Sequence, residues 1–415
     1  MTIRARLGMI LAGCGVWAAA LWYYVRTWHT FAQFAAFLDH CSVLFCDFTG
    51  YYYPQGQATW STAVPVGGYV YSAPFALALS ALRNVPVDRA VILWGIGEAF
   101  ATAGLFVAPL LPAFGGARRT WVAVAVYSFA FVSSTAVLSN LKWGQVSALI
   151  VFTILLALWL AERGTPTTAG VALAVPIAIK YYPAAFLAYF AIRRQWRAIT
   201  VCVVCLGLFV AATMVVRGVG WTLEFQSRTH QAEVEALRIW IWNDDNSQFL
   251  THVVRRWMHV PTLPVSVETR WQWAGYAVCA VNVLTLWLIR RLPPARLVCW
   301  GALLLFAATP FWLPTSWPHY FVYLPALQLF ALDDWLEHRR WRPMELIRAA
   351  LILASILAAS SVVLLEWYGS WDAYRALAPL FVSNALLLIY LYSRLAASTS
   401  WTRMPHGSVA KVPSV

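Results

Sequence analysis

The stretch AGVALAVPIAIKYYPAAFLAYFAIRRQWR, residues 169–197, decides how this chain is arranged. It is apolar over most of its length, yet its middle holds Pro176, Lys180 and Pro183. Proline interrupts helical hydrogen bonding, and a lysine at the centre of a bilayer costs at least about 2.5–3.5 kcal/mol on insertion scales. Two arrangements are open. The stretch is either a broken hairpin of two short helices over residues 169–192, with Lys180 near its turn, or one kinked span.

The remainder of the chain has the composition of an integral membrane protein. Of its 415 residues, 61% are apolar and 11% are charged, and the mean hydropathy is +0.64. A soluble domain of this size is roughly a quarter charged. The 24 tryptophans and 18 tyrosines fit the same class, because amphipathic rings collect at the headgroup level. We therefore predict an all-α polytopic membrane protein that lies in the lipid bilayer.

Further apolar runs are predicted membrane helices, at about residues 8–25, 90–111, 121–139, 145–161, 198–216, 272–290, 297–312, 319–336, 346–366 and 375–393. With the two arms of the hairpin, we expect about twelve membrane helices in a single domain over residues 1–397. Residues 11–14 resemble a lipoprotein cleavage box, but the apolar run continues beyond them. We expect an uncleaved first span. Residues 398–415 are predicted to be a disordered cytoplasmic tail.

The net charge of +13 is interpreted as a topology signal, with no nucleic-acid partner. Basic residues gather in short loops, and such loops face the cytoplasm. They are Arg4, Arg6, Arg118, Arg119, Arg163, Arg193, Arg194, Arg197, Arg290, Arg291, Arg296, Arg339, Arg340 and Arg342. Placing all of them inside requires the hairpin and puts both termini in the cytoplasm. Two large loops, at about 26–89 and 217–270, then face outward.

Several polar residues converge at the outer rim of this arrangement. Asp47 follows the first span, Lys180 is the one lysine within an apolar helical segment, and His319 opens a later span. Glu98 is the one acid well inside a span. A loop-capping aspartate is the alternative interpretation of Asp47. The residues expected near Asp47 favour a catalytic role, because an acid, an imidazole and an ammonium meet at the outer rim.

Such a set suits one type of glycosyl transfer. A glycosidase generally needs two carboxylates, one of which protonates a poor leaving group. A sugar activated as a lipid phosphate needs no such acid, because the phosphate leaves as a stable anion. It needs one base for the acceptor hydroxyl and cations for the phosphate. One aspartate with a lysine meets that requirement.

At this point the chain resembles glycosyltransferase family 87, which includes polyprenyl-phosphate-dependent α-mannosyltransferase-like proteins of the GT-C class. The resemblance rests on the order and spacing of six segments within residues 40–335. These are CDFTGYYYPQGQA, VYSAPFALALSAL, LKWGQVSALIVFTILLALWLAERG, the opening stretch extended to Ala198, DDNSQFLTHVVRRW and SWPHYFVYLPAL.

The resemblance implies roles for individual residues. Asp47 matches the essential acid of the first outer loop, the expected general base. Lys180 matches the lysine of the broken hairpin, which would bind the donor phosphate. Gln145 matches the polar residue that opens the fourth span, and Asn246 matches the asparagine of the second outer loop. His319 matches the histidine of the Trp-x-His motif and is expected to be catalytic.

Two departures from the family pattern concern the donor sugar and the acceptor. Tyr320 stands where the family usually has a second histidine. The usual Asn-Gln-Ser order reads Asn246-Ser247-Gln248 here.

The resemblance implies an inverting, metal-independent enzyme without a cofactor. It would move a hexose, mannose by the family's pattern, from polyprenyl phosphate to a lipid or glycan hydroxyl at the outer face of the bacterial plasma membrane. Tyr51, Tyr52 and Trp143 would line the substrate cleft. A lipid-linked glycan ligase or polymerase, or a lipid-linked sugar transporter without chemistry, are the alternatives.

Two features of the outer loops leave alternatives open. Asp244 and Asp245 invite a metal interpretation, although the resemblance implies no metal. Cys41 and Cys46 could pair if the first loop faces an oxidising compartment.

Overall fold

The structure is a computed structural model that describes residues 3–38, 41–113, 117–236, 245–338 and 342–397. Its α-helices are α1 (Ile3–Thr27), α2 (Phe31–Leu38), α3 (Tyr53–Ala58), α4 (Ala73–Leu79), α5 (Val87–Val107), α6 (Ala117–Val132), α7 (Thr135–Trp143), α8 (Ser147–Glu162), α9 (Pro166–Ile179), α10 (Leu187–Ile192), α11 (Trp196–Arg217), α12 (Val219–Ala236), α13 (Leu250–Trp257), α14 (Val265–Leu288), α15 (Pro294–Trp312), α16 (Leu324–His338), α17 (Pro343–Ala359), α18 (Ser361–Val363), α19 (Trp371–Leu377) and α20 (Pro379–Ala397). Short 3₁₀ or π turns are η1 (Phe48–Tyr52), η2 (Ser80–Leu82), η3 (Ala108–Leu110), η4 (Tyr182–Phe186), η6 (Pro318–Tyr323) and η7 (Leu364–Tyr368). The predicted all-α membrane class is confirmed.

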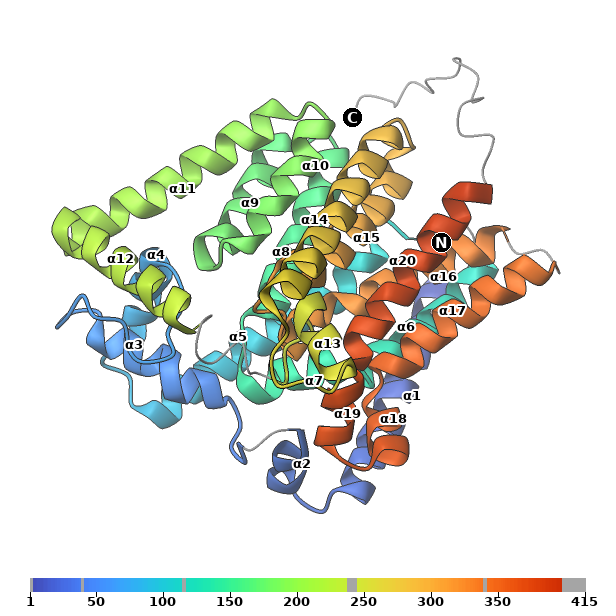
Figure 1. The fold of residues 1–415 in the computed structure, drawn as a ribbon, viewed down its shortest axis with the longest axis horizontal. Coiled ribbons are helices and arrows are strands. Elements are labelled where there is room, and N and C mark those ends of the chain that lie inside the picture. The colour runs from blue at the N-terminus through green and yellow to red at the C-terminus, as the bar shows by residue number, and fades with distance from the viewer. Residues whose placement is uncertain (1–2, 39–40, 114–116, 237–244, 339–341, 398–415) are drawn as a thin grey trace.

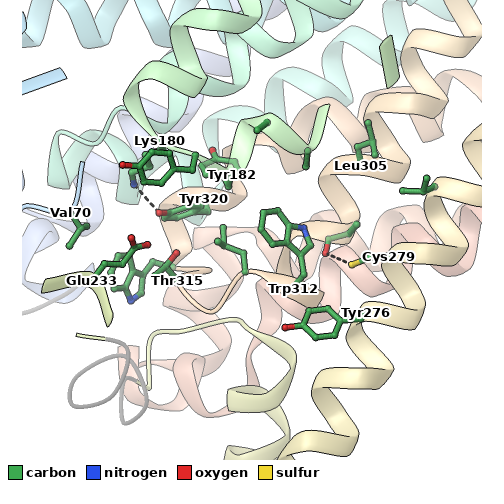
Figure 2. A pocket seen from close by; sticks show the side chains of 17 residues that line it. Val70, Lys180, Tyr182, Glu233, Tyr276, Cys279, Leu305, Trp312, Thr315 and Tyr320 are labelled. Atoms are coloured by element: carbon green, nitrogen blue, oxygen red, sulfur yellow. Dashed lines mark hydrogen bonds between the residues drawn. The ribbon is translucent and has the colours of Figure 1, made fainter. Parts of the chain in front are cut away.

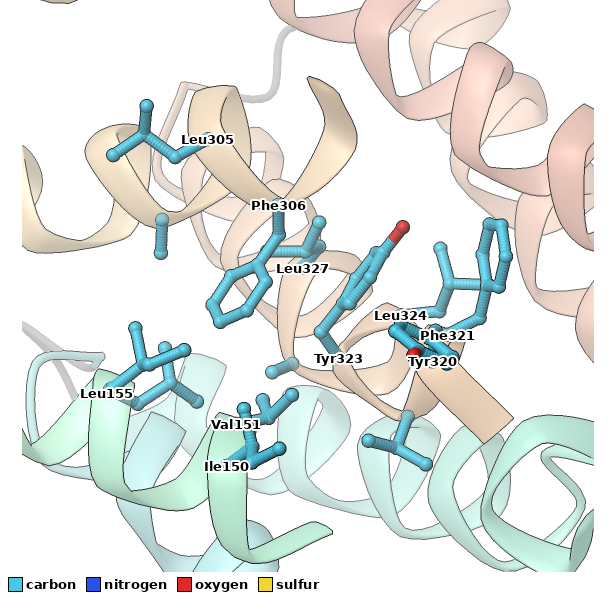
Figure 3. Close-up of a cluster of buried hydrophobic side chains, with 14 of the residues drawn as sticks. Ile150, Val151, Leu155, Leu305, Phe306, Tyr320, Phe321, Tyr323, Leu324 and Leu327 are labelled. Atoms are coloured by element: carbon cyan, nitrogen blue, oxygen red, sulfur yellow. The ribbon is translucent and has the colours of Figure 1, made fainter. Parts of the chain in front are cut away.

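The core lies where α8, α15 and the η6–α16 segment meet (Figure 3). Ile150, Val151 and Leu155 of α8 face Phe306 of α15 and Tyr323 of η6. The rings of Phe306 and Tyr323 stack with centroids 5.0 Å apart. In Figure 1, α11 and α12 lie at one flank of the molecule, and α17 and α20 lie at the other.

Two of the predicted spans are broken where their serines meet. The predicted helix at 121–139 divides into α6 and α7 at Ser133 and Ser134, and the one at 346–366 divides at Ser360. A β-bridge joins Ser134 to Ser360, and the amide of Ser361 donates to the carbonyl of Ser133 (2.6 Å). Serine side chains also cap the helices that follow each break. These local bonds offer the backbone an alternative to the helical ladder.

Four helical segments of the described chain are long and apolar enough to cross a membrane. They are Val87–Leu110, Trp196–Arg217, Pro294–Trp312 and Trp371–Ala397. A fifth is formed if α7 and α8, bent by 120° at their junction, count as one span. The predicted number of twelve is not confirmed, because breaks shorten many of the apolar segments.

The 169–192 segment returns to the end of the molecule from which it starts. Arg193, after α10, forms an ion pair with Glu162 at the end of α8 (2.8 Å), and its guanidinium donates to the carbonyl of Arg290 (2.6 Å). Both ends of the segment therefore lie together, as in the predicted hairpin. The basic loops after α8, α10 and α14 meet at this end, and Lys180 is at the opposite turn.

Both predicted outer loops contain helices. The first holds α2 to α4 with η1 and η2, and the second holds α12 and α13. Trp221 of α12 donates its indole N–H to the carbonyl of Thr62 (2.8 Å), so the two loops pack against each other.

Candidate active site

Asp47 lies at the start of η1 and contacts the predicted site residue Gln145. The side-chain amide N–H of Gln145 donates to Oδ2 of Asp47. The amide oxygen of Gln145 accepts hydrogen bonds from the hydroxyls of Tyr52 (2.9 Å) and Tyr71 (3.0 Å). These two hydroxyls also bond to each other. Both polar atoms of the buried amide are thus used, and they fix its orientation.

Gly144 makes the turn that presents Gln145. It ends α7 in the left-handed conformation, at φ 64°, which is costly for a residue with a side chain. A Cβ at this position would also lie 2.9 Å from Cβ of Phe45 and 3.1 Å from Nε1 of Trp94. The conformation and the close packing both require glycine. This is the physical basis of the Gly144-Gln145 pair seen in the sequence.

Lys180 joins the same cluster from the turn of the hairpin. Pro176 lies inside α9, which continues to Ile179, and Lys180 then leaves the helix in an extended conformation. Its ammonium donates to the hydroxyl of Tyr320 (2.9 Å). It also lies 4.5 Å from the ring centroid of Tyr71 and 4.4 Å from that of Tyr320.

Tyr71 connects the two halves of this network. Its hydroxyl bonds to Gln145 and its ring lies beneath the ammonium of Lys180. Lys180 is buried. No carboxylate of the described residues lies within ion-pair distance of its ammonium. A buried cation held by hydroxyls and ring faces is suited to receive an anion.

A cavity of about 690 Å³ opens beside Lys180 (Figure 2). Its polar end is formed by the side chains of Lys180, Tyr320, Thr315 and Glu233. The rest of its wall is mostly apolar. Most of it comes from α14, α15 and η4 and the residues next to them: Tyr276, Cys279, Val283, Leu305, Ala308, Trp312, Leu313, Tyr181, Tyr182, Ala184 and Ala185. Val70 and Trp317 complete it. The cavity therefore fits an amphiphile with a charged head and an apolar tail.

Glu233 of α12 is the carboxylate that faces this cavity among its described lining residues. Burial raises the pKa of Glu233, and the nearby charges of His230 and Lys180 oppose that rise. The α12 helix is anchored beside the hairpin turn, because Gln226 donates to the hydroxyl of Tyr181. The second outer loop thus contributes a charged group next to Lys180.

His319 packs against the ring of Tyr320. The rings of these two residues are 5.0 Å apart, and Tyr320 stands between His319 and Lys180 in the chain of contacts. Within the described chain, Nε2 of His319 is buried without a hydrogen-bond partner. The catalytic role predicted for His319 remains a prediction.

Tyr51 and Trp143 are both predicted to line the cleft, and they lie close in the sequence to Asp47 and Gln145, respectively. Tyr51 is partly exposed to solvent, and its ring packs on Gly68. Its pKa is raised, by burial of part of the ring and by the neighbouring charge of Asp47. The ring of Trp143 lies 4.6 Å from the ammonium of Lys142. Lys142 is also buried and lies in α7, which forms a bent candidate span with α8, so the expectation that Lys180 alone lies in an apolar helical segment is wrong.

The Asn246 segment contacts the loop that leads to Tyr320. Ser247 donates to the carbonyl of Pro314 (3.1 Å), and the amide of Gln248 donates to the carbonyl of Ser316 (2.7 Å). Asn246 accepts a hydrogen bond from the indole of Trp371 (3.0 Å), and it is not among the described residues that line the cavity. Its predicted place in the substrate cleft is not tested by these contacts.

Cys41 and Cys46 form a disulfide directly before Asp47. Inside the loop that it closes, the amide of Phe45 donates to the carbonyl of Lys142 (2.7 Å). The loop is thereby attached to the end of α7, close to Gln145.

Asp245, considered above as a metal ligand, pairs with Arg255 (2.9 Å). Asp244 lies outside the described residues.

Three residues of the site were not predicted as such from the sequence: Tyr71, Tyr320 and Glu233. Tyr71 lies in a segment quoted for the family resemblance, and Tyr320 was noted as a departure from the family. Glu233 carries no sequence signal, because its position depends on how α12 packs against the hairpin turn.

The sequence profile of Glycosyltransferase family 87 matches residues 69–313. Two curated relatives are each named polyprenol-phosphate-mannose-dependent alpha-(1-2)-phosphatidylinositol mannoside mannosyltransferase. The protein from Mycobacterium tuberculosis is 25% identical over 302 residues, which make up 71% of this chain and 62% of the relative. The protein from Mycolicibacterium smegmatis is 27% identical over 256 residues, which make up 54% of this chain and 50% of the relative.

The match covers less than two thirds of the length of either relative. No solved structure matches the chain significantly. The family profile includes Tyr71, Gln145 and Lys180 of the network, whereas Asp47 and His319 lie outside the matched range. Because the profile spans more than half of the sequence, the chain belongs to glycosyltransferase family 87.

Proposed function

We propose that this protein is an inverting, metal-independent glycosyltransferase of the GT-C class. It takes a hexose, mannose, from a polyprenyl-phosphate donor and transfers it to a hydroxyl of a lipid or glycan at the outer face of the plasma membrane. Membership of family 87 and the names of the two relatives support this donor.

The observation that carries the proposal is the setting of Lys180. Its buried ammonium lies at the polar end of a cavity with a mostly apolar wall. A phosphate at Lys180 and Tyr320 would place an attached prenyl chain along α14 and α15. A buried lysine without an anionic partner is costly in a membrane protein, and a bound phosphate offsets that cost.

Asp47 and the cavity lie at the two ends of a chain of contacts that runs through Gln145, Tyr71 and Lys180. Asp47 is not among the described residues that line the cavity. This arrangement supports a reaction in which the acceptor approaches from the Asp47 side and the donor tail leaves on the other. Attack opposite to the departing group inverts the anomeric centre.

The chemistry follows from these positions. Asp47 takes the proton of the acceptor hydroxyl, whose oxygen forms the bond to the anomeric carbon. The bond between that carbon and the phosphate oxygen breaks, and its electron pair stays on the phosphate. Lys180, together with the hydroxyl of Tyr320, His319 and an arginine, stabilises the developing negative charge. Tyr51, Tyr52 and Trp143 provide flat walls for the sugars.

The test uses purified protein in vesicles with radiolabelled polyprenyl-phosphate mannose. Lipids extracted from a strain that lacks this protein supply the acceptor. We expect label in a new glycoside, with release of polyprenyl phosphate. Label that crosses the membrane without forming a glycoside would instead identify a transporter, and a product that carries a preassembled glycan would identify a ligase or polymerase.

A further inference from the structure

Glu98 is a buried acid that the proposed reaction does not use. It lies on α5, within the candidate span Val87–Leu110, most of which faces away from the protein interior. The Glu98 side chain itself points inward and is buried. An ionisable group at such a position is costly and is usually retained for function.

The contacts of Glu98 lead to the turn that carries Gln145. Oε2 of Glu98 accepts a hydrogen bond from the side-chain amide of Asn140 (2.9 Å). The oxygen of that amide accepts from the backbone N–H of Ala148, at the start of α8 (3.2 Å). The backbone carbonyl of Asn140 accepts from the N–H of Gln145 (3.0 Å). One residue, Asn140, therefore bridges both sides of the turn between α7 and α8.

Trp94, four residues before Glu98 on α5, contacts the same connection between α7 and α8. Its indole N–H donates to the carbonyl of Gly144 (3.0 Å), and its ring stacks on Phe48 with centroids 4.6 Å apart. Phe48 directly follows Asp47. Residues four apart share a helix face, so Trp94 and Glu98 together present one face of α5 to the turn.

We propose that Glu98 is a positioning residue, which acts through Asn140 to hold the turn that aims the Gln145 amide at Asp47. Its role is to accept a hydrogen bond, and no proton transfer is involved. Without that acceptor, the buried Asn140 amide must find another partner, and Asn140 loses the orientation that fixes the turn. The consequence for catalysis rests on the proposed function, whereas the effect on the turn does not.

The test compares Glu98→Leu, Glu98→Gln and the matched control Thr102→Val. Thr102 lies one turn further along α5, and its hydroxyl is buried without a hydrogen-bond partner within the described chain. For each protein, hydrogen–deuterium exchange is measured over residues 140–148, and kcat and the donor KM are measured with polyprenyl-phosphate mannose. Glutamine keeps an acceptor oxygen for Asn140 and removes the charge.

We expect Glu98→Leu to speed exchange at the Gln145 amide and to lower kcat about 10- to 100-fold, with the donor KM within about twofold of wild type. Glu98→Gln and Thr102→Val should behave as wild type in both measurements. Wild-type exchange in Glu98→Leu would overturn the inference. A Glu98→Gln protein with slowed transfer would also overturn it, and this outcome remains decisive if Glu98→Leu does not fold. If the wild type transfers no sugar, the proposed function fails, but the exchange comparison still decides whether Glu98 holds the turn.

Discussion

Replacing Lys180 by methionine separates a donor-binding role from a structural one. Methionine keeps an unbranched apolar side chain of similar length but removes the ammonium. In a donor complex, that ammonium would contact a phosphate at a buried site. Loss of one partner of a buried, hydrogen-bonded charge pair costs about 2–5 kcal/mol, or about 30- to 5,000-fold in Kd. We expect Lys180→Met to weaken binding of polyprenyl-phosphate mannose by this factor.

Tyr320→Phe provides the graded comparison. It removes the hydroxyl that accepts from Lys180 and keeps the ring face 4.4 Å from the ammonium. The loss of one ordinary hydrogen bond is worth about 0.5–1.5 kcal/mol, or about 2- to 12-fold in Kd. The donor affinity should therefore fall in the order wild type, Tyr320→Phe, Lys180→Met. Binding can be followed by thermophoresis of the purified protein in detergent.

Two controls make this result specific. Lys142→Met removes the other lysine that is buried within the described part of the chain. Lys142 is not among the described residues of the cavity wall, so donor binding should be unchanged. Uncharged polyprenol should bind Lys180→Met as well as it binds the wild type, because the apolar wall is intact. The Lys180 ammonium is desolvated and has no carboxylate partner among the described residues, so Lys180→Met should leave the Tm of the protein unchanged or raise it. Wild-type donor affinity in Lys180→Met, or equal losses in Lys180→Met and Lys142→Met, would refute the reasoning.

Three further predictions concern the base, the cavity carboxylate and the topology. Asp47→Asn should fold and bind donor but lose about 10²–10⁴-fold in rate, and a near wild-type rate in the transferase assay would place the base elsewhere. Glu233→Gln removes a negative charge near the phosphate site, where repulsion on the order of 1 kcal/mol should yield about fivefold tighter donor binding in titrations; weaker binding would instead indicate a contact with the sugar. Cysteines at the exposed positions Gln57 and Arg228 should react with an impermeant reagent from outside, whereas one at the exposed Arg197 should not; the reverse pattern would invert the topology.

The sequence was informative where a residue type is costly in its surroundings. A lysine between two prolines in an apolar segment predicts a break, and the basic loops on either side favour a hairpin over one kinked span. The Arg193–Glu162 ion pair closes that segment as a hairpin does. The glycine before Gln145 likewise has a local cause, because its left-handed conformation ends α7. Such features depend on short-range sterics and on the cost of burying charge. Both can be judged from a few neighbouring residues.

Features that depend on distant partners could not be predicted in this way. The serines at 133–134 and at 360–361 interrupt apolar runs where they bond to each other across the bundle. Tyr320 was interpreted as a departure from the family pattern, yet its hydroxyl accepts the hydrogen bond of Lys180, 140 residues earlier in the chain. Glu233 reaches the cavity because α12 packs beside the hairpin turn. No local pattern encodes these pairings.

The division of the site between two structural units explains why the network between them consists of an amide and tyrosines. Asp47 directly follows the disulfide of the first outer loop, and Lys180 belongs to the hairpin. An aspartate and a lysine in direct contact would neutralise each other, and each would then be less available to a substrate. Gln145 and Tyr71 carry no charge at neutral pH, and burial raises the pKa of the Tyr71 hydroxyl further. They can therefore hold the two charged groups in a fixed relation and keep them apart, as the proposed reaction requires of a base and a phosphate-binding cation.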